Sequence, residues 1–175
     1  MSNTIITIGR QYGSGGHKIG EFLSNRLQLP YYDDELMVIE AGMENALYYG
    51  ESEDVPFDLY QNIIRKLAGK GDAIMIGRCA DEILRGEGCK VLSVFIAAPL
   101  SQRVARTVRC EGFPEEVVIA EIERKDAARK AFYESHAGRE WGVPGSYDLY
   151  YDTSTNDIGS VIVDIIRHYK ALKDS

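Results

Sequence analysis

The segment GRQYGSGGHK at residues 9–18 has the composition of a loop that binds a phosphate. Gly13, Gly15 and Gly16, with Ser14 among them, let the backbone turn so that successive N–H groups point at one anion. The loop also precedes a helical pattern, and a helix N-terminus favours negative charge. The sequence leaves one alternative open, a tight strand-to-helix turn that binds no ligand.

The loop departs from the pattern GxxxxGK[ST] of phosphate-binding loops. Arg10 stands at the first glycine, Gly16 stands where the lysine belongs, and His17 replaces Ser or Thr. In that pattern the lysine neutralises phosphate and the hydroxyl helps to hold magnesium, so both groups are missing from their usual places. Lys18 lies two positions late and points about 200° around the helix from position 16. Arg10 is the better candidate for the missing cation, because it leaves the strand towards the loop and carries a fork of donors.

Arg78 and a pair of aspartates follow two other apolar runs. Arg78 comes after the run at 73–77, where a planar group with five donors suits bidentate binding of a phosphate. Asp33 ends the run at 29–33 and Asp34 follows it, and one of them is suited to hold magnesium-bound water or to orient an acceptor hydroxyl. The other interpretation is an N-cap of the next helix, for which Asp34 is the favoured residue.

Apolar runs and helical patterns alternate along the whole chain. Strands are expected at 4–8, 29–33, 73–77, 91–97 and within 147–155, and helices at 18–27, 34–49, 58–70, 80–85, from Pro99 onward, at 115–137 and at 157–172. Such alternation predicts a parallel sheet covered by helices on both faces, with ligands beyond the carboxyl ends of the strands. Because no repeat, low-complexity tract or linker interrupts it, residues 1–175 are expected to form one domain.

Composition excludes several classes of partner. Against 20 Lys and Arg stand 27 Asp and Glu, and the net charge of −7 opposes binding to a nucleic acid polymer or an acidic membrane surface. Cys79, Cys89 and Cys110 form no CxxC pair, and the three histidines are scattered, so neither a disulfide framework nor a protein metal site is expected. The longest apolar run, 91–98, is too short to cross a bilayer, and no signal peptide is seen. A cytoplasmic protein is expected.

Five segments together resemble a known family. They are ITIGRQYGSGGHKIGEFLSNRLQLPYYDDEL, AIMIGRCADEIL, VFIAAPLSQRVART, ERKDAARKAFY and YDLYYDTS. In order and spacing they resemble the cytidylate kinase-like proteins, relatives of cytidylate kinase among the nucleoside monophosphate kinases. The resemblance implies an α/β, three-layer P-loop kinase-like fold with a five-stranded parallel sheet in the order 2-3-1-4-5. It also implies lid regions near 38–70 and 107–145, ATP at the glycine loop, Mg2+, and phosphate transfer to a small acceptor.

The resemblance also assigns acceptor residues. Arg78 matches the arginine that contacts the acceptor phosphate, but Cys79 stands where cytidylate kinases have Asp. Asp126 and Arg129 match the last two members of an RxxxDxxR arrangement that grips the acceptor, whereas Ile122 occupies its first position. These two departures weaken the expectation of a preference for cytidine.

The candidate residues divide into three groups. Arg106 lies one helical turn after Arg103 on the same face of the helix that follows the fourth strand, where it either serves the nucleotide or forms a solvated surface. The residues expected to act are Arg10, Asp33 and Arg129 in catalysis; Gly13, Ser14, Gly15, Gly16, His17 and Arg106 on the ATP side; and Arg78, Asp126 and Arg129 on the acceptor side.

Two functions follow from these assignments. The first is ATP-dependent phosphotransfer to a nucleoside monophosphate, CMP-like, or to another small metabolite. The second is a non-catalytic nucleotide-binding or sensing protein with a degenerate P-loop, since the missing lysine and hydroxyl remove charge stabilisation that phosphoryl transfer requires. A fold of this type that binds no nucleotide is the third alternative. The first two differ in whether Arg10, His17 or Lys18 brings positive charge to the γ-phosphate.

Overall fold

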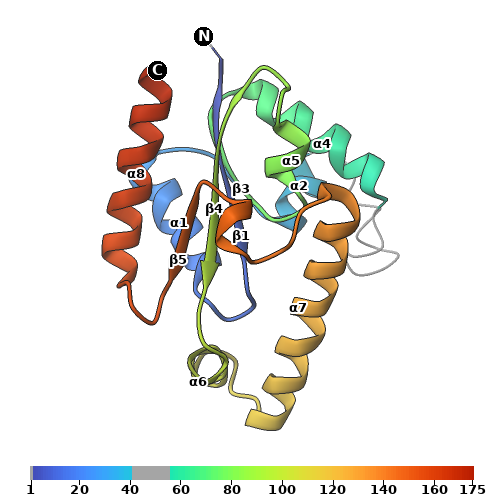
Figure 1. The fold of residues 1–175 in the computed structure, drawn as a ribbon, viewed down its shortest axis with the longest axis vertical. Coiled ribbons are helices and arrows are strands. Elements are labelled where there is room, and N and C mark those ends of the chain that lie inside the picture. The colour runs from blue at the N-terminus through green and yellow to red at the C-terminus, as the bar shows by residue number, and fades with distance from the viewer. Residues whose placement is uncertain (1, 41–55) are drawn as a thin grey trace.

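The computed structural model describes residues 2–40 and 56–175. A parallel sheet of five strands runs in the order β2-β3-β1-β4-β5, between two layers of helices (Figure 1). The strands are β1 (Thr4–Arg10), β2 (Tyr31–Tyr32), β3 (Ala73–Ile76), β4 (Lys90–Ala97) and β5 (Leu149–Asp152). The predicted fold class and strand order are both confirmed.

The helices follow the predicted alternation. They are α1 (Gly16–Leu27), α2 (Asp34–Glu40), α4 (Phe57–Lys70), α5 (Ala80–Leu84), α6 (Leu100–Glu111), α7 (Glu115–Ala137) and α8 (Ile158–Asp174), with a 3-10 turn η2 (Pro144–Ser146). Helices α1 and α8 cover one face of the sheet, and α2, α4 and α5 cover the other (Figure 1). None of the helices within the described ranges has the length and apolar character that a membrane span requires.

The two hydrophobic cores arise from the alternation of side chains along the strands. In β1, Ile5 packs into the core beneath α4, whereas Ile6 and Ile8 pack into the core beneath α1 and α8. In β3, Met75 and Ile76 divide in the same way. Because both faces of a parallel sheet are buried, these strands are continuous apolar runs, as the sequence shows.

Strand β1 is longer than the predicted run at 4–8. Gly9 and Arg10 continue the pairing with β4, opposite Phe95 and Ile96. Gly9 is suited to this place because a β-carbon there would lie 2.9 Å from Cδ2 of Phe95. The extension carries Arg10 to the carboxyl edge of the sheet, opposite the edge where both chain termini lie (Figure 1).

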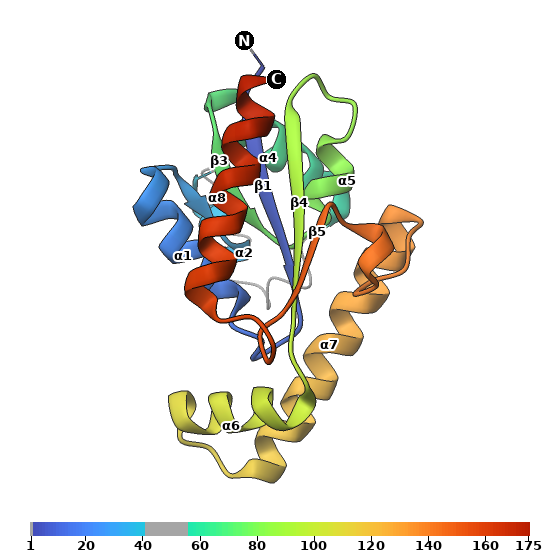
Figure 2. The same cartoon turned by 60° about the vertical axis from the view of Figure 1, so that its left-hand side comes forward.

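Helix α6 and the first half of α7 project beyond the carboxyl edge of the sheet (Figure 2). A small third core of Val104, Val118 and Ile122 joins them. The predicted lid region 107–145 includes this projection, and its role as a lid stays a prediction. Of the other predicted lid, 38–70, and of the helix predicted at 34–49, residues 41–55 lie outside the described residues. Helix α4 contributes a buried face to the core.

Candidate active site

The glycine loop, residues 10–17, joins β1 to α1. Gly13 and Gly15 have φ angles of 75° and 96°, the left-handed region that glycine adopts without strain. Helix α1 begins at Gly16, and no side chain of the described structure caps it at Gly15. Its first N–H groups are therefore free to bind an anion. The hydroxyl of Ser14 is fully buried and has no hydrogen-bond partner among the described residues.

Arg106 covers the glycine loop from α6. Its Nη1 donates a hydrogen bond of 2.6 Å to the carbonyl oxygen of Gly13, and the guanidinium passes beside Gly15. Burial, and secondly the charge of Arg109, lower the pKa of Arg106. Arg103, one turn earlier, donates to the backbone oxygens of Ala98 and of Tyr12, the second of which also belongs to the loop. Of this pair, Arg106 lies against Gly13 and Gly15, and its role in nucleotide binding stays a prediction.

His17 and Lys18 both turn away from the loop. The His17 ring packs edge-on against Tyr31, with Nδ1 2.9 Å from the tyrosine hydroxyl, and Nε2 lies 3.5 Å from a carboxylate oxygen of Glu21. Lys18 places its ammonium 5.7 Å from the ring centroid of Phe22, on the exposed side of α1. Neither side chain contacts the position of the missing lysine.

Arg10 passes between two glycines. A β-carbon on Gly16 would lie 2.6 Å from Cβ of Arg10, and one on Gly77 would lie 2.6 Å from its Nη1. The side chain therefore reaches from the glycine loop to the end of β3, where its guanidinium lies. Burial lowers the pKa of Arg10, and the nearby carboxylate of Asp34 opposes this effect while the charge of Arg78 adds to it.

A cavity of about 770 Å³ opens at the carboxyl edge of the sheet and is lined by side chains from the strand ends and from α7. Its cations are Arg10, Arg78, Arg124, Lys125 and Arg129; its carboxylates are Asp34, Glu35, Asp81 and Glu121; its aromatic residues are Phe132, Tyr133, Trp141 and Tyr147. We call Arg10, Arg78 and Arg129 the arginine cluster, and Tyr133, Trp141 and Tyr147 the aromatic wall. Residues 11–17 of the glycine loop do not line the cavity.

Arg78 enters the cavity from a strained turn. Gly77, Arg78 and Cys79 have successive φ angles of 75°, 54° and 56°, and the left-handed region costs a residue with a side chain about 1–2 kcal/mol. The guanidinium lies between the rings of Tyr60 and Phe132, 5.0 and 5.2 Å from their centroids. This turn and these rings hold Arg78 in the cavity.

Asp34 is the carboxylate of the arginine cluster. Its Oδ2 accepts a hydrogen bond of 2.9 Å from Nη2 of Arg78. Its Oδ1 is buried and accepts no hydrogen bond from the part of the chain that the structure describes.

The sequence predicts a catalytic role for Asp33 and an N-cap role for Asp34, and the structure places the two residues the other way round. Strand β2 ends at Tyr32, and α2 begins at Asp34, so the residue between them occupies the N-cap. Oδ1 of Asp33 accepts a hydrogen bond of 2.9 Å from the backbone N–H of Leu36, as an N-cap does. Asp34 lies in the cavity, and Asp33 does not line it.

Arg129 and Asp126 both belong to α7, but their side chains lie in different places. Arg129 lines the cavity, and its Nη1 donates to the carbonyl oxygen of Arg10 at 3.4 Å. Burial, and secondly the charge of Arg10, lower the pKa of Arg129 to about 10, so it stays cationic at neutral pH. Asp126 accepts hydrogen bonds of 2.7 Å from the Tyr12 N–H and from Arg103, and it does not line the cavity. The structure brings Arg78 and Arg129 together and leaves Asp126 outside.

Comparison with known proteins agrees with this geometry. The model of the cytidylate kinase-like family matches residues 5–45 and 37–155. The chain belongs to the cytidylate kinase-like family. A cytidylate kinase from Methanocaldococcus jannaschii is 26% identical over 165 residues, which cover 90% of this chain and 92% of that protein.

Solved structures show the same fold as this cytidylate kinase-like chain. An uncharacterized protein from Eubacterium ventriosum superposes with a TM-score of 0.82 at 27% identity, over 95% of this chain and 98% of that one. Shikimate kinase from Bacteroides thetaiotaomicron gives 0.60 at 14% identity, over 97% and 99%. A gluconokinase from Sinorhizobium meliloti gives 0.62 at 12% identity, over 98% and 94%. The architecture is that of the P-loop kinases.

The sequence analysis assigned no role to the aromatic wall or to Asp81. Oδ2 of Asp81, which is 5% exposed, accepts a hydrogen bond of 2.8 Å from the hydroxyl of Tyr133, and burial raises the pKa of Asp81. One signal was available, because Lys125, Arg129 and Tyr133 recur at intervals of four residues and so share one face of α7. Trp141 and Tyr147 belong to the irregular segment after α7, where periodicity says nothing.

The residues of this cytidylate kinase-like chain fit a triphosphate. The free N–H groups of α1, the buried Ser14 hydroxyl and Arg106 are all suited to phosphate oxygens. No cluster of three or more His, Cys, Asp or Glu side chains within 2–40 and 56–175 could hold a metal ion by itself. A magnesium ion bound mainly by phosphates and water needs only one or two carboxylates from the protein. Asp34 could supply such a carboxylate, because its Oδ1 accepts no hydrogen bond from the described residues.

Proposed function

We propose that the protein is an ATP-dependent kinase whose acceptor is a small molecule that already carries a phosphate, such as a CMP-like nucleoside monophosphate. The observation that supports this most strongly is the arginine cluster beside the glycine loop. Three cations, Arg10, Arg78 and Arg129, line one cavity, and the described carboxylate among them is Asp34. Buried positive charge that exceeds its carboxylate partners favours an anionic ligand.

The reaction requires no new proton acceptor when the acceptor is an ionised phosphate. An acceptor oxygen forms a bond to the γ-phosphorus of ATP, the bond from that phosphorus to the β–γ bridging oxygen breaks, and ADP leaves with the electron pair. The glycine loop and Arg106 would hold the triphosphate, while Arg78 and Arg129 would hold the acceptor phosphate. Catalysis of this kind consists mainly of positioning and charge stabilisation.

The aromatic wall favours an acceptor with a flat ring. Tyr133 and Tyr147 lie 5.8 Å apart, centroid to centroid, and Trp141 also lines the cavity. Asp81 is held beside them by Tyr133. The carboxyl oxygens of Asp81 have further lone pairs, which can accept a hydrogen bond from the N4 amino group of cytosine. These features support a CMP-like acceptor although Cys79 and Ile122 depart from the cytidylate kinase pattern.

A sensing function is the second candidate. Neither His17 nor Lys18 reaches the position of the missing lysine, and the hydroxyl that usually helps to hold magnesium is absent. A protein of this kind would bind ATP at the loop without transferring phosphate.

Separate binding and transfer assays distinguish these functions. Calorimetry with ATP, CMP, UMP and AMP measures binding, and chromatography of ATP and magnesium mixtures with each monophosphate detects the diphosphate product. We expect transfer to a pyrimidine monophosphate and at least a tenfold rise in the KM of that acceptor in Arg78→Ala. Arg85→Ala removes an exposed arginine of a surface ion pair nearby and should change nothing. ATP binding without any diphosphate product would favour the sensor.

A further inference from the structure

We infer that Arg10 and Gly16 are a reciprocal exchange of the glycine and the lysine of a P-loop, so that the catalytic cation enters from the strand and stands on the acceptor side of the loop. This inference rests on the proposed function. It assigns one guanidinium to both substrates, where a lysine at position 16 would approach the phosphates from the helix.

The exchange is inferred because the side chain of Arg10 occupies the space that a side chain at position 16 would need. A β-carbon on Gly16 would lie 2.6 Å from Cβ and 3.1 Å from Cγ of Arg10. Cβ is attached to the backbone of a strand that is paired with β4, so it cannot move aside as a side-chain tip can. An arginine at position 10 therefore requires glycine at position 16. Glycine at position 10 would leave this space to a side chain at position 16.

The far end of Arg10 shows where its charge goes. Nη1 lies over Gly77, at the end of β3, where a β-carbon would be 2.6 Å away. Arg10 also lines the cavity beside Asp34, whereas residues 11–17 do not line it. The side chain thus begins in the glycine loop and ends among the acceptor residues. A fork of donors in this place can bridge the acceptor phosphate and the phosphoryl group that moves.

The other nearby cations do not serve this position. Lys18 lies over Phe22, and His17 is bonded to Tyr31. Arg106 reaches the loop from α6, at the carbonyl of Gly13, and does not line the cavity. Lys125 and Arg129 also line the cavity, but they approach the loop at the ring of Tyr12, 4.9 and 5.6 Å from its centroid. Arg10 is the described cation whose side chain lies against Gly16 and also enters the cavity.

A double-mutant cycle tests the exchange with three readouts. The variants are Arg10→Gly, Gly16→Lys, the combination of both, and Lys18→Ala as the matched control. The thermal midpoint without ligand measures the shared space, calorimetry measures the affinity for ATP, and chromatography measures the transfer rate to the best acceptor.

Each readout has an expected result, and the affinity for ATP should fall in Arg10→Gly and return in the double variant. Gly16→Lys alone should lower the thermal midpoint by about 4 °C or more, and the same substitution in the Arg10→Gly background should lower it by less than about 2 °C. Arg10→Gly should reduce the transfer rate about 100-fold or more, the double variant should recover at least about tenfold of that loss, and Lys18→Ala should stay within about twofold of wild type.

Three results would overturn the inference. One is an Arg10→Gly enzyme of unchanged rate. Another is a Gly16→Lys midpoint that falls equally in both backgrounds, because the two positions would then share no space. The third is a stable double variant that is as slow as Arg10→Gly. If wild type transfers phosphate to no acceptor, the proposed function fails, and the exchange is then decided by the stability cycle and by whether ATP affinity falls in Arg10→Gly and returns in the double variant.

Discussion

Arg103 and Asp126 form an ion pair, with 2.7 Å between Nη1 and Oδ2, that joins α6 to α7 beneath the glycine loop. Both side chains are largely buried, at 9% and 16% exposure, and Asp126 also accepts from the backbone N–H of Tyr12. The pair therefore fastens the loop to the two helices that project beyond the sheet. In this structure Asp126 holds the glycine loop and does not line the cavity.

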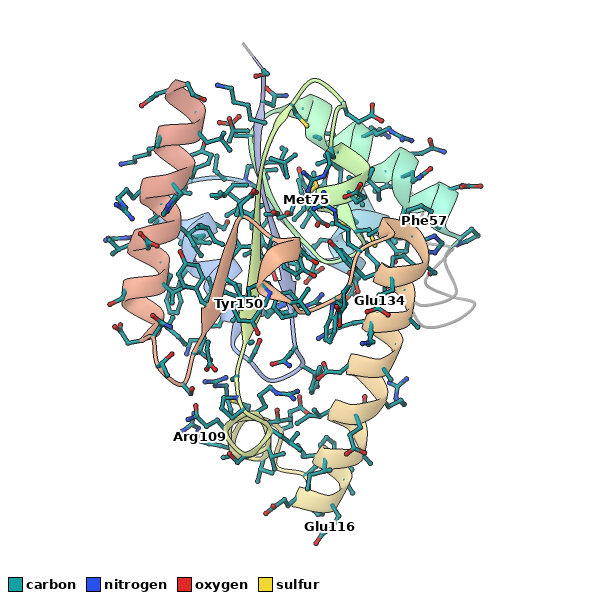
Figure 3. The ribbon with its side chains drawn as sticks, viewed as in Figure 1. Phe57, Met75, Arg109, Glu116, Glu134 and Tyr150 are labelled. Atoms are coloured by element: carbon teal, nitrogen blue, oxygen red, sulfur yellow. The ribbon has the colours of Figure 1, made fainter. Side chains whose placement is uncertain are left out.

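Asp126→Asn tests this support. The amide can still accept from Tyr12 but leaves the buried charge of Arg103 unpaired, so we expect the free energy of unfolding to fall by about 2–3 kcal/mol. ATP binding should weaken, whereas acceptor affinity should hold. Urea denaturation and calorimetry measure these effects. Glu116→Gln, at the exposed end of α7 far from the sheet (Figure 3), is the control and should change stability by less than about 0.5 kcal/mol. A variant of normal stability with a raised acceptor KM would show that Asp126 grips the acceptor.

Arg106→Ala should weaken ATP binding selectively. The side chain contacts the carbonyl of Gly13, so its removal uncovers the loop without changing the cavity. We expect about a tenfold rise in the Kd for ATP, with the acceptor Kd unchanged. Arg109→Ala removes the same charge from the exposed last turn of α6 and should leave both constants unchanged. An equal loss of ATP affinity in both variants would indicate that the overall positive charge of α6, rather than a contact of Arg106, favours ATP.

Gln28→Gly should stabilise the protein. Gln28 ends α1 in the left-handed conformation, at φ 55° and ψ 42°, and it is exposed. Glycine adopts this conformation without strain, so we expect a gain of about 0.5–1 kcal/mol and a midpoint higher by roughly 2–4 °C. Arg26→Gly, an exposed helical position two residues earlier, should instead lose roughly 1 kcal/mol. Thermal unfolding of both variants checks the prediction, which a fall in both midpoints would contradict.

Asp81 should make stability depend on pH. Burial raises its pKa, so the folded chain keeps this proton to higher pH than the unfolded chain does. Its contribution is therefore full below the unfolded pKa of about 3.9 and is lost as pH rises through the folded pKa. Asp81→Asn cannot ionise and still accepts from Tyr133.

The Asp81→Asn variant should gain stability relative to wild type as pH rises from about 3.5 to 7. Urea denaturation at successive pH values measures this difference. Asp58→Asn, exposed in the first turn of α4, is the control and should follow the wild-type profile. Parallel profiles for Asp81→Asn and wild type would mean that Asp81 titrates normally in the folded protein.

The sequence predicts the architecture well because buried parallel strands are continuous apolar runs that stand out from helical periodicity. The order of strands and loops places Arg10 and Arg78 at the carboxyl edge, and the family resemblance adds Arg129 to them. The sequence prediction fails where a shift of one residue at the end of a strand determines which side chain faces the cavity. Whether Asp33 or Asp34 faces the cavity depends on where β2 ends, and residue types alone do not specify that point.

The remaining differences concern side-chain direction. His17 is at the correct loop position but is drawn to Tyr31, a residue 14 positions away whose proximity depends on the packing of β2 against α1. Asp126 likewise has a partner, Arg103, on another helix. Such contacts become visible only when the elements are assembled.

The left-handed turn at Arg78 affects the entropy of acceptor binding. Two aromatic rings and a carboxylate already confine this guanidinium before any ligand arrives. Ordering a long, mobile side chain during association normally opposes binding by about 0.5–1.5 kcal/mol. Here that loss of freedom occurs once, when the chain folds. An anionic ligand thus meets a preorganised receptor, and most of its contact energy with Arg78 remains as affinity.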